Sequence, residues 1–297
     1  MKGEDGMTAA RLYMRFPGER AKAVTLSYDD HTEQDIRLIE ILDRNGMKGT
    51  FNISTGLHAP EGKVFKEGTV CRRLTRRRAI ELYKNSGHEV AVHGYSHPFL
   101  AQMPSSAVVR EIYLDRIGLE EDFETDVRGL AYPFGDYSYS NEVADALKAV
   151  GIVYARMTSP TRNFRLPTDW LRWQPTCKHT DENLMRMARD FVANSAKNEP
   201  ILFYLWGHSF EFEADDNWQV IEEFCDYMGK RDDIWYATNI EIYDYVQAYR
   251  HLIWTADMTR VKNPSAIPVS FQYHTIEADG EIKKNYTVGA GQVLKLR

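Results

Sequence analysis

Short apolar segments alternate with helical segments along most of this chain, and this alternation restricts the folds open to it. Residues 21–28 (AKAVTLSY) are rich in apolar and β-branched side chains, which is typical of a buried strand. Residues 34–46 then carry apolar side chains at helical spacing and end at Gly46, where a helix favours a left-handed residue. The two segments form the first of several strand–helix units.

The same alternation repeats to about residue 252. Six more strands are predicted at 47–53, 88–93, 127–132, 151–157, 200–207 and 233–238. Helices are predicted at about 75–86, 105–125, 140–150, 180–197, 217–229 and 240–252, and Thr75 is a candidate N-cap. Strands connected through helices run parallel, in a doubly wound sheet or a closed barrel. The pattern alone does not separate these two folds.

From about residue 258 the helical segments stop. Two segments rich in β formers, FQYHTIE and EIKKNYTV, flank the turn-like pair Asp279-Gly280. We therefore expect residues 1–257 to form an α/β domain and residues 258–297 to form a small β-rich appendage.

The charge balance argues against a nucleic-acid partner. The 297 residues include 37 basic and 43 acidic side chains, a net charge of −6, whereas phosphate binding needs clustered positive charge. One basic run is the exception, and we interpret it as a solvated helix face. It consists of Arg72, Arg73, Arg76, Arg77 and Arg78.

The location of the protein is predicted from its cysteines and apolar runs. Cys71, Cys177 and Cys225 are widely spaced and odd in number, which favours neither a disulfide framework nor a metal-binding pair. The N-terminal residues lack the apolar stretch of a signal peptide, and no apolar run approaches the length of a membrane span. We expect a cytoplasmic protein that does not contact a membrane.

Polar side chains follow the predicted strands where each strand ends. In chain order they are Asp29 and Asp30, His93 and His97, the segment Tyr132–Gly135, and His208. Parallel α/β folds place active sites at the carboxyl edge of the sheet, so these four segments are predicted to converge.

Each of these features alone also has an ordinary structural explanation. An aspartate pair can cap a helix or solvate a turn, and a strand-end histidine such as His208 is commonly a hydrogen-bonded structural residue. The pair His93 and His97 with a carboxylate would form a site for zinc, cobalt or nickel, but the pair alone is weak evidence. Their predicted convergence favours a functional site.

In order and spacing, these motifs resemble those of the polysaccharide deacetylases, carbohydrate esterase family four, over roughly residues 20–250. Ser27–His31 resembles the family's Thr-Phe-Asp-Asp-Gly motif, and His93–His97 has its H-x-x-x-H spacing. The segments Ala131–Gly135, Asp169-Trp170 and Leu205–His208 are similar to the three remaining motifs. The resemblance implies a distorted (β/α)7 barrel, which agrees with the seven predicted strands.

The resemblance also implies a role for each site residue. Asp30, His93 and His97 would hold one divalent metal ion, zinc first, with Co²⁺, Ni²⁺ or Mn²⁺ as alternatives. Asp29 would be the general base, His208 the general acid, and Asp169 the partner that orients His208. The residues implied in substrate binding are Tyr132, Pro133, Phe134, Trp170 and Trp206, and a backbone N–H of the 132–134 segment would stabilise an oxyanion.

Two positions depart from the family pattern. His31 replaces the glycine after the aspartate pair, and Ala131 stands where the family's arginine holds the catalytic aspartate. Arg128, Arg156 and Arg172 are candidate replacements, and Arg156 at the end of a strand is the best placed of them.

Other polar residues receive weaker predictions. His179 either lines the pocket or flanks a helix. The acidic stretch Glu211, Glu213, Asp215 and Asp216 is interpreted as a solvated loop and cap.

The sequence therefore predicts a metal-dependent hydrolase that removes acetyl groups from N-acetylated or O-acetylated oligo- or polysaccharides. A hydrolase of a non-sugar amide and a non-catalytic carbohydrate-binding relative remain as alternatives. The preferred sugar, the position of its acetyl group and the oligomeric state are left open.

Overall fold

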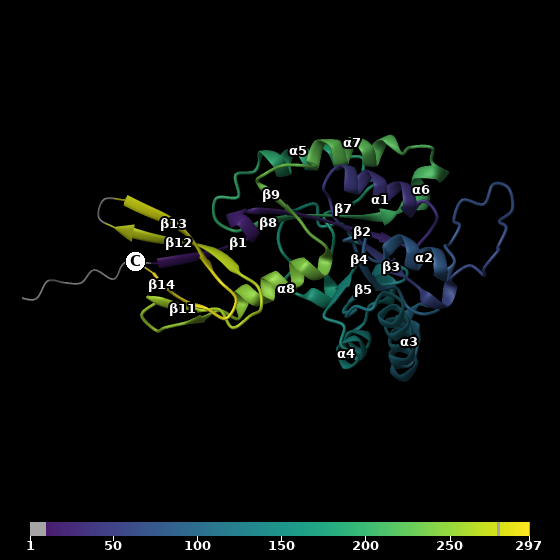
Figure 1. The fold of residues 1–297 in the computed structure, drawn as a ribbon, viewed down its shortest axis with the longest axis horizontal. Coiled ribbons are helices and arrows are strands. Elements are labelled where there is room, and N and C mark those ends of the chain that lie inside the picture. The colour runs from purple at the N-terminus through teal and green to yellow at the C-terminus, as the bar shows by residue number, and fades with distance from the viewer. Residues whose placement is uncertain (1–9, 278–279, 297) are drawn as a thin grey trace, which may run out of the picture.

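A computed structural model describes residues 10–277 and 280–296 and shows a curled parallel sheet with helices around it (Figure 1). Seven strands follow one another in the order β6-β5-β4-β3-β2-β8-β7, and β9 pairs with β2. These strands are β2 (Lys22–Asp29), β3 (Gly49–Ile53), β4 (Glu89–Val92), β5 (Gly129–Ala131), β6 (Tyr154–Arg156), β7 (Cys177–Lys178), β8 (Ile201–His208) and β9 (Ile234–Tyr236). The curled half-barrel confirms the predicted distorted (β/α)7 fold class.

Helices connect most of these strands. They are α1 (Asp35–Arg44), α2 (Arg76–Tyr83), α3 (Ser105–Phe123), α4 (Asn141–Ala149), α5 (Leu184–Ala193), α6 (Ser209–Ala214), α7 (Gln219–Met228) and α8 (Asn239–Arg250). Short 3-10 helices are η1 (Pro17–Glu19), η2 (Thr55–Leu57), η3 (Leu100–Gln102), η4 (Gly135–Ser138) and η5 (Trp170–Arg172). The predicted cap at Thr75 is confirmed, because its side chain accepts a hydrogen bond from the Arg78 amide.

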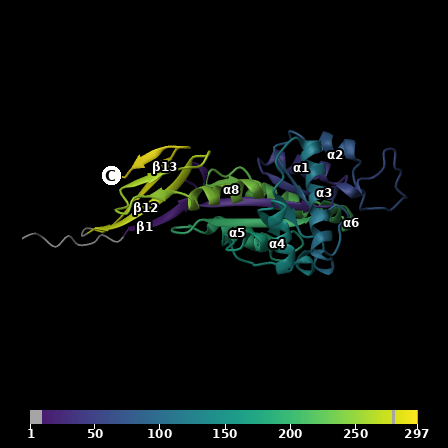
Figure 2. The ribbon, with the colours of Figure 1, turned by 90° about the horizontal axis from the view of Figure 1, so that it is seen from below.

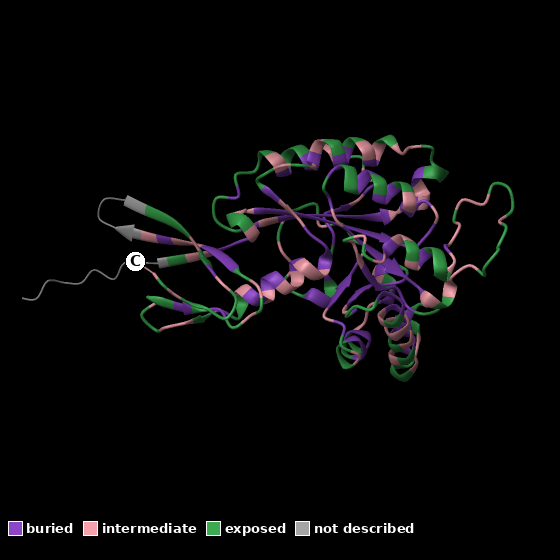
Figure 3. Ribbon diagram, in the orientation of Figure 1, coloured by how far each residue is buried: buried purple, intermediate pink, exposed green. Residues whose placement is uncertain are grey.

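The central strands are buried on both faces, as strands of a parallel sheet covered by helices are. All eight residues of β2 are buried, and Figure 3 shows the sheet as the buried centre of the molecule. Val24, Leu26 and Phe203 belong to its main apolar core. This packing fixes the carboxyl ends of the strands relative to one another.

A second body of β structure lies at one end of the molecule (Figures 1 and 2). It contains two antiparallel three-stranded sheets with the orders β1-β12-β13 and β10-β11-β14. These strands are β1 (Ala10–Arg15), β10 (Ile253–Trp254), β11 (Arg260–Lys262), β12 (Val269–Glu277), β13 (Gly280–Val288) and β14 (Val293–Lys295). Asp279 of the predicted turn lies outside the described residues, and the predicted boundary after residue 257 stays a prediction.

The described helices include none with the length and apolar character needed to span a membrane.

Candidate active site

Four strands of the main sheet bring polar side chains to one edge. β2 ends at Asp29, β4 ends one residue before His93, β6 ends at Arg156 and β8 ends at His208. β2 lies beside both β3 and β8, and Asp29 and His208 are register partners. The predicted convergence at the carboxyl edge of the sheet is therefore present.

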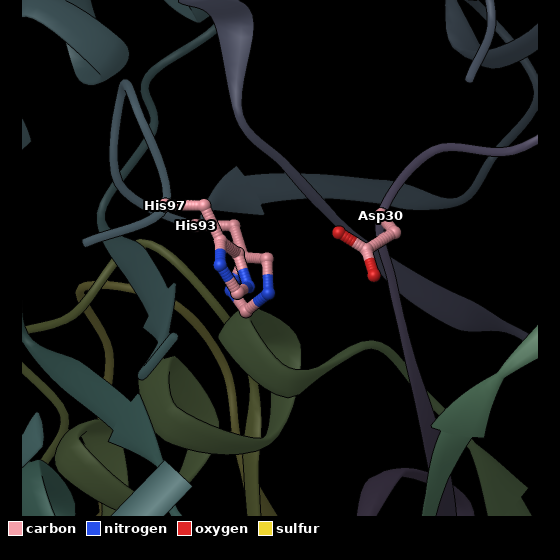
Figure 4. Close-up of side chains that lie close together, drawn as sticks. All are labelled: Asp30, His93 and His97. Atoms are coloured by element: carbon pink, nitrogen blue, oxygen red, sulfur yellow. The ribbon is translucent and has the colours of Figure 1, made fainter. Parts of the chain in front are cut away.

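Asp30, His93 and His97 form a three-residue cluster of metal-ligand type. One ligand atom from each lies within 4.8 Å of the others, and Figure 4 shows the carboxylate facing the two imidazole rings from a separate segment. A tight turn brings the two histidines together. The His97 amide donates to the Gly94 carbonyl at 3.1 Å, and Gly94 and His97 both have positive φ. The ring centroids of His93 and His97 are 4.7 Å apart.

The protonation of these side chains suits a metal ion. His93 Nδ1 lies 2.8 Å from the Ala131 carbonyl and so carries the proton, which leaves a lone pair on Nε2. Burial lowers the pKa of His93, and burial with the nearby His93 lowers the pKa of His97 to about 4. Neutral imidazoles with one carboxylate are a donor set that fits zinc and related divalent ions.

Asp30 supplies that carboxylate. Burial would raise its pKa, but His93 and Arg73 outweigh burial, so the pKa of Asp30 is lowered and the group is ionised at neutral pH. Arg73 Nη2 donates to its Oδ1 at 2.8 Å, and no hydrogen bond is present at Oδ2 among the described residues.

Asp29 lies beside this cluster as a buried carboxylate. Arg156 donates from Nη2 to Asp29 Oδ1 at 2.6 Å, and Asn52 donates to the same oxygen at 2.8 Å. Burial alone would raise the pKa of Asp29, but Arg156, with His93 and His208, lowers it to about 2. Asp29 is therefore a charged acceptor at neutral pH.

Arg156 supplies the guanidinium that Ala131 cannot. The two residues are register partners on the neighbouring strands β5 and β6. Arg156 therefore reaches Asp29 from β6, at the position opposite Ala131 on β5. The predicted contact of Arg156 is confirmed. The other two candidates are engaged elsewhere, since Arg128 pairs with Asp244 at 2.7 Å and Arg172 stacks on Tyr139.

His208 lies on the other side of Asp29. Its Nε2 is 3.7 Å from Asp29 Oδ2, and its Nδ1 is 3.2 Å from Oε1 of Glu211. Burial would lower the pKa of His208, but Glu211 and Asp29 outweigh burial and raise it. An ionised carboxylate and an imidazole with a raised pKa therefore lie side by side at this edge of the sheet.

The prediction that Asp169 is the partner of His208 is wrong. Asp169 caps η5, where its side chain accepts from the Leu171 amide at 3.0 Å, and it lines a separate cavity of about 360 Å³ with Asp136 and Arg172. Glu211 takes the place at His208 because the first turn of α6 brings a residue three positions on back to the strand end. The sequence interpretation of Glu211 as a solvated residue is also wrong.

Glu211 connects His208 to two further side chains. Lys178 Nζ donates to Oε1 at 2.6 Å, and His179 Nε2 lies 3.0 Å from Oε2. His179 is buried, with its ring centroid 4.2 Å from that of Phe212. Burial would raise the pKa of Glu211, but His179 and His208 outweigh burial and hold the pKa well below its usual range. His179 therefore supports Glu211.

An aromatic surface borders the metal-ligand cluster. Phe134 is 44% exposed, stacks on Phe99 with a centroid distance of 3.7 Å, and packs edge-on against His97 at 4.6 Å. Trp206 lies deeper, with the Arg156 guanidinium 4.5 Å above its ring. The exposed pair offers a flat apolar face beside the polar site.

Trp170, Tyr132 and Pro133 are buried. The Trp170 ring packs edge-on against Trp173 at 4.8 Å and Tyr243 at 5.1 Å. Trp170 belongs to an apolar core cluster, and its assignment to the wall of the substrate pocket stays a prediction. Tyr132 donates from its hydroxyl to the Leu171 carbonyl, which fixes the segment that follows β5.

The segment after β5 also presents one backbone donor. The Tyr132 amide donates to the Arg156 carbonyl at 3.1 Å, and Pro133 has no N–H. Phe134 has φ +59°, and its amide has no hydrogen-bond acceptor among the described residues. Of the three residues predicted to supply an oxyanion donor, Phe134 has the available N–H.

His31 directly follows Asp30 in the chain. It is buried, packs edge-on against His58 at 4.8 Å, and accepts a backbone hydrogen bond from the Leu74 amide. Burial lowers its pKa well below the usual range, so the ring is neutral. The residue that replaces the family's glycine therefore supports the loop around residue 74 and lies outside the metal-ligand cluster.

Comparison with known proteins agrees with this geometry. Residues 17–155 match the family model described as polysaccharide deacetylase, a segment that includes Asp29, Asp30, His93 and His97. No curated protein sequence matches the chain.

Solved structures share the fold at low sequence identity. A putative polysaccharide deacetylase from Mycobacterium smegmatis is 16% identical, with 80% of this chain and 94% of that chain covered and a TM-score of 0.55. The Puue allantoinase is 10% identical, with 77% and 91% covered and a TM-score of 0.54. The Streptococcus pyogenes deacetylase PplD is 21% identical with a TM-score of 0.38, and the match covers 45% of this chain and 55% of that one.

Proposed function

We propose that this chain is a metal-dependent hydrolase of acetylated oligo- or polysaccharides. The premise is that it belongs to the polysaccharide deacetylase family through residues 17–155. The proposal rests on one observation above all. An ionised Asp29 and a His208 with raised pKa lie 3.7 Å apart beside the donor set of Asp30, His93 and His97. Acetyl transfer to water needs a base, an acid and an electrophile in such an arrangement.

The residues of the site divide this reaction among them. A divalent ion held by Asp30, His93 and His97 would polarise the acetyl carbonyl and lower the pKa of a bound water. Asp29 accepts the proton of the attacking water, and Arg156 keeps Asp29 ionised before that step. The carbonyl carbon becomes tetrahedral, and the Phe134 N–H donates to the oxyanion that develops.

His208 completes the reaction. Protonated and held by Glu211, it donates a proton to the leaving nitrogen of an N-acetyl group or to the leaving oxygen of an ester. The C–N or C–O bond then breaks and acetate is released. The exposed faces of Phe134 and Phe99 are suited to packing against a sugar ring.

Acetate release from a substrate panel tests the proposal. The full chain, metal-free and loaded with Zn²⁺ or Co²⁺, is incubated with N-acetylglucosamine oligomers and acetylated xylan, where acetate is measured, and with allantoin, where the ring-opened product is measured. We expect acetate from at least one acetylated glycan only after metal loading. Hydrolysis of allantoin alone would replace the proposal with an amidohydrolase, and no turnover by a metal-loaded sample would favour a carbohydrate-binding protein.

A Glu211→Gln variant should move the alkaline limb of the pH–rate profile to lower pH. Glu211 raises the pKa of His208, and the proton donor must be protonated, so removing the carboxylate ends activity at a lower pH. The kcat profile between pH 6 and 10 measures the shift. We expect about one pH unit, which corresponds to the loss of about 1.4 kcal/mol of interaction between Glu211 and the protonated His208.

Glu213→Gln is the matched control, since Glu213 lies on the same helix and pairs with Arg72. Its profile should superimpose on that of the wild type, and so should that of Asp169→Asn. A shift in Asp169→Asn with none in Glu211→Gln would contradict the assignment of Glu211.

A further inference from the structure

Arg73 is the arginine of the basic run that reaches the active site. Its Nη2 donates to Asp30 Oδ1 at 2.8 Å, and its side chain is 29% exposed. Other arginines of the run pair with carboxylates elsewhere, Arg76 with Asp122 and Arg78 with Glu33. In the reaction described above, Arg73 helps to keep Asp30 ionised and contacts no group of the substrate.

Most of the hydrogen-bonding capacity of this guanidinium is unused. An arginine has five N–H donors in a planar fork, and one bond, to Asp30, is present among the described residues. Its Nε is buried and has no acceptor among those residues. Nη1 also has no acceptor among those residues and, unlike Nε, is not buried, so Nη1 is the donor that an acceptor from outside the chain can reach.

The charges around the site favour a negative acceptor. The three carboxylates Asp29, Asp30 and Glu211 are each paired with a cation, namely Arg156, Arg73 and Lys178. A divalent ion at the donor set would add two positive charges without a further carboxylate. An anion close to Arg73 would then meet a positive potential, and a planar guanidinium is suited to bidentate binding of a carboxylate.

Arg156 and Lys178 are less suited to this task. The Arg156 side chain is fully buried and binds Asp29, and Lys178 donates to Glu211 and lies 5.4 Å above the Trp206 ring. Arg73 combines partial exposure, contact with a metal-ligand residue and unused donors.

We infer that Arg73 is a specificity-determining residue that binds a carboxylate carried by the sugar substrate close to the acetyl group that is removed. The inference deepens the proposed function and rests on it. The preferred substrates are then acidic acetylated sugars, in which the same molecule offers a carbonyl to the metal-ligand cluster and an anion to Arg73.

A matched pair of substrates tests the inference. Chitooligosaccharides and the same oligomers oxidised to C6 carboxylates are compared by kcat/KM in the wild type, Arg73→Gln and the control Arg78→Gln. We expect the wild type to prefer the carboxylated oligomer at least tenfold, Arg73→Gln to lose that preference, and Arg78→Gln to keep it. A wild type that prefers the neutral oligomer, or a ratio unchanged in Arg73→Gln, would overturn the inference.

The ratio separates recognition from support of Asp30. If Arg73 only holds Asp30, Arg73→Gln lowers kcat/KM for both substrates equally and the ratio stays constant. Metal content and a circular dichroism melt of each variant show that the site and the fold are intact. Arg73→Lys keeps the positive charge but loses the planar guanidinium donors, so it should retain an intermediate preference for the carboxylated oligomer.

Binding without turnover keeps the inference independent of the proposed function. Glucuronate and glucose are titrated into the Asp29→Asn variant and into the double variant Asp29→Asn/Arg73→Gln by calorimetry. We expect glucuronate to bind more tightly than glucose only where Arg73 is present. Equal binding of the two sugars to the Asp29→Asn variant would overturn the inference, whereas absence of acetate release from the wild type would overturn the proposed function.

Discussion

An Asp29→Asn variant should lose at least about 10³-fold in kcat/KM for acetyl hydrolysis, within the range of about 10²–10⁴ that general acid–base catalysis contributes. Asparagine keeps the shape of the side chain and an oxygen for Arg156, but its neutral amide cannot accept the proton of the attacking water. Asp29 is not a member of the metal-ligand cluster, so the variant should bind as much zinc as the wild type. Initial rates of acetate release, with zinc content measured on the same sample, check both statements.

Asp169→Asn is the matched control for this substitution. It makes the same chemical change at a carboxylate that caps η5, and it should keep most of the activity. If Asp29→Asn kept more than a tenth of wild-type kcat/KM with full metal content, another group would be the base and the account of Asp29 would fail.

Arg156→Met should destabilise the folded protein by about 3–5 kcal/mol near neutral pH, the usual cost of leaving one partner of a buried ion pair alone. The Arg156 and Asp29 side chains are 0% and 3% exposed, so water cannot compensate the remaining carboxylate. Urea unfolding measures the change in the free energy of unfolding. Activity should fall as well, since the pKa of Asp29 rises and the acid limb of the pH–rate profile moves to higher pH.

The pH dependence of this stability loss follows from the lowered pKa of Asp29. The folded-state pKa is about 2, below the ordinary 3.8, so ionised Asp29 stabilises the fold above about pH 4 and loses this contribution as pH falls towards 2. The difference between wild type and Arg156→Met should therefore be largest at pH 6–7 and shrink in acid.

Arg128→Met provides the comparison for Arg156→Met. Arg128 pairs with Asp244 through side chains that are 33% and 42% exposed, and surface pairs contribute about 0–1 kcal/mol. Equal destabilisation by the two substitutions would contradict a special role of the buried pair.

The sequence predicted most of the main sheet because its two longest strands are apolar runs and most of the shorter ones alternate with helices. β2 and β8 each have eight residues, and the period of the intervening helices is clear. β7 and α6 were missed since they have two and six residues, too few for a periodic pattern. β1 was also missed, because it is recognised only by its pairing with β12, more than 250 residues away along the chain.

The site was predictable where its residues are set by local spacing. Asp30, His93 and His97 follow strand ends within short motifs, and Arg156 was favoured by its place at the end of a strand. The partner of His208 was not predictable in the same way. It depends on a six-residue helix that turns Glu211 back toward the strand end, while Asp169 is held away by its own cap on η5.

The arginine run shows a similar limit. Arg76, Arg77 and Arg78 are exposed at the start of α2, as a solvated helix face predicts. Arg72 and Arg73 instead bind Glu213 and Asp30, which belong to segments far away in the sequence. Tertiary pairing of this kind has no signal in a run of like charges.

Zinc titration of the metal-free chain is the direct test of metal-dependent hydrolysis at Asp30, His93 and His97. Acetate release from the best substrate of the panel and bound zinc are measured together as the ion is added. We expect no acetate release without metal and a rate that rises in proportion to bound zinc until one ion per chain is reached, with no such rise in His97→Ala. Full acetate release by the metal-free chain, or unchanged zinc-dependent activity in His97→Ala, would contradict this expectation.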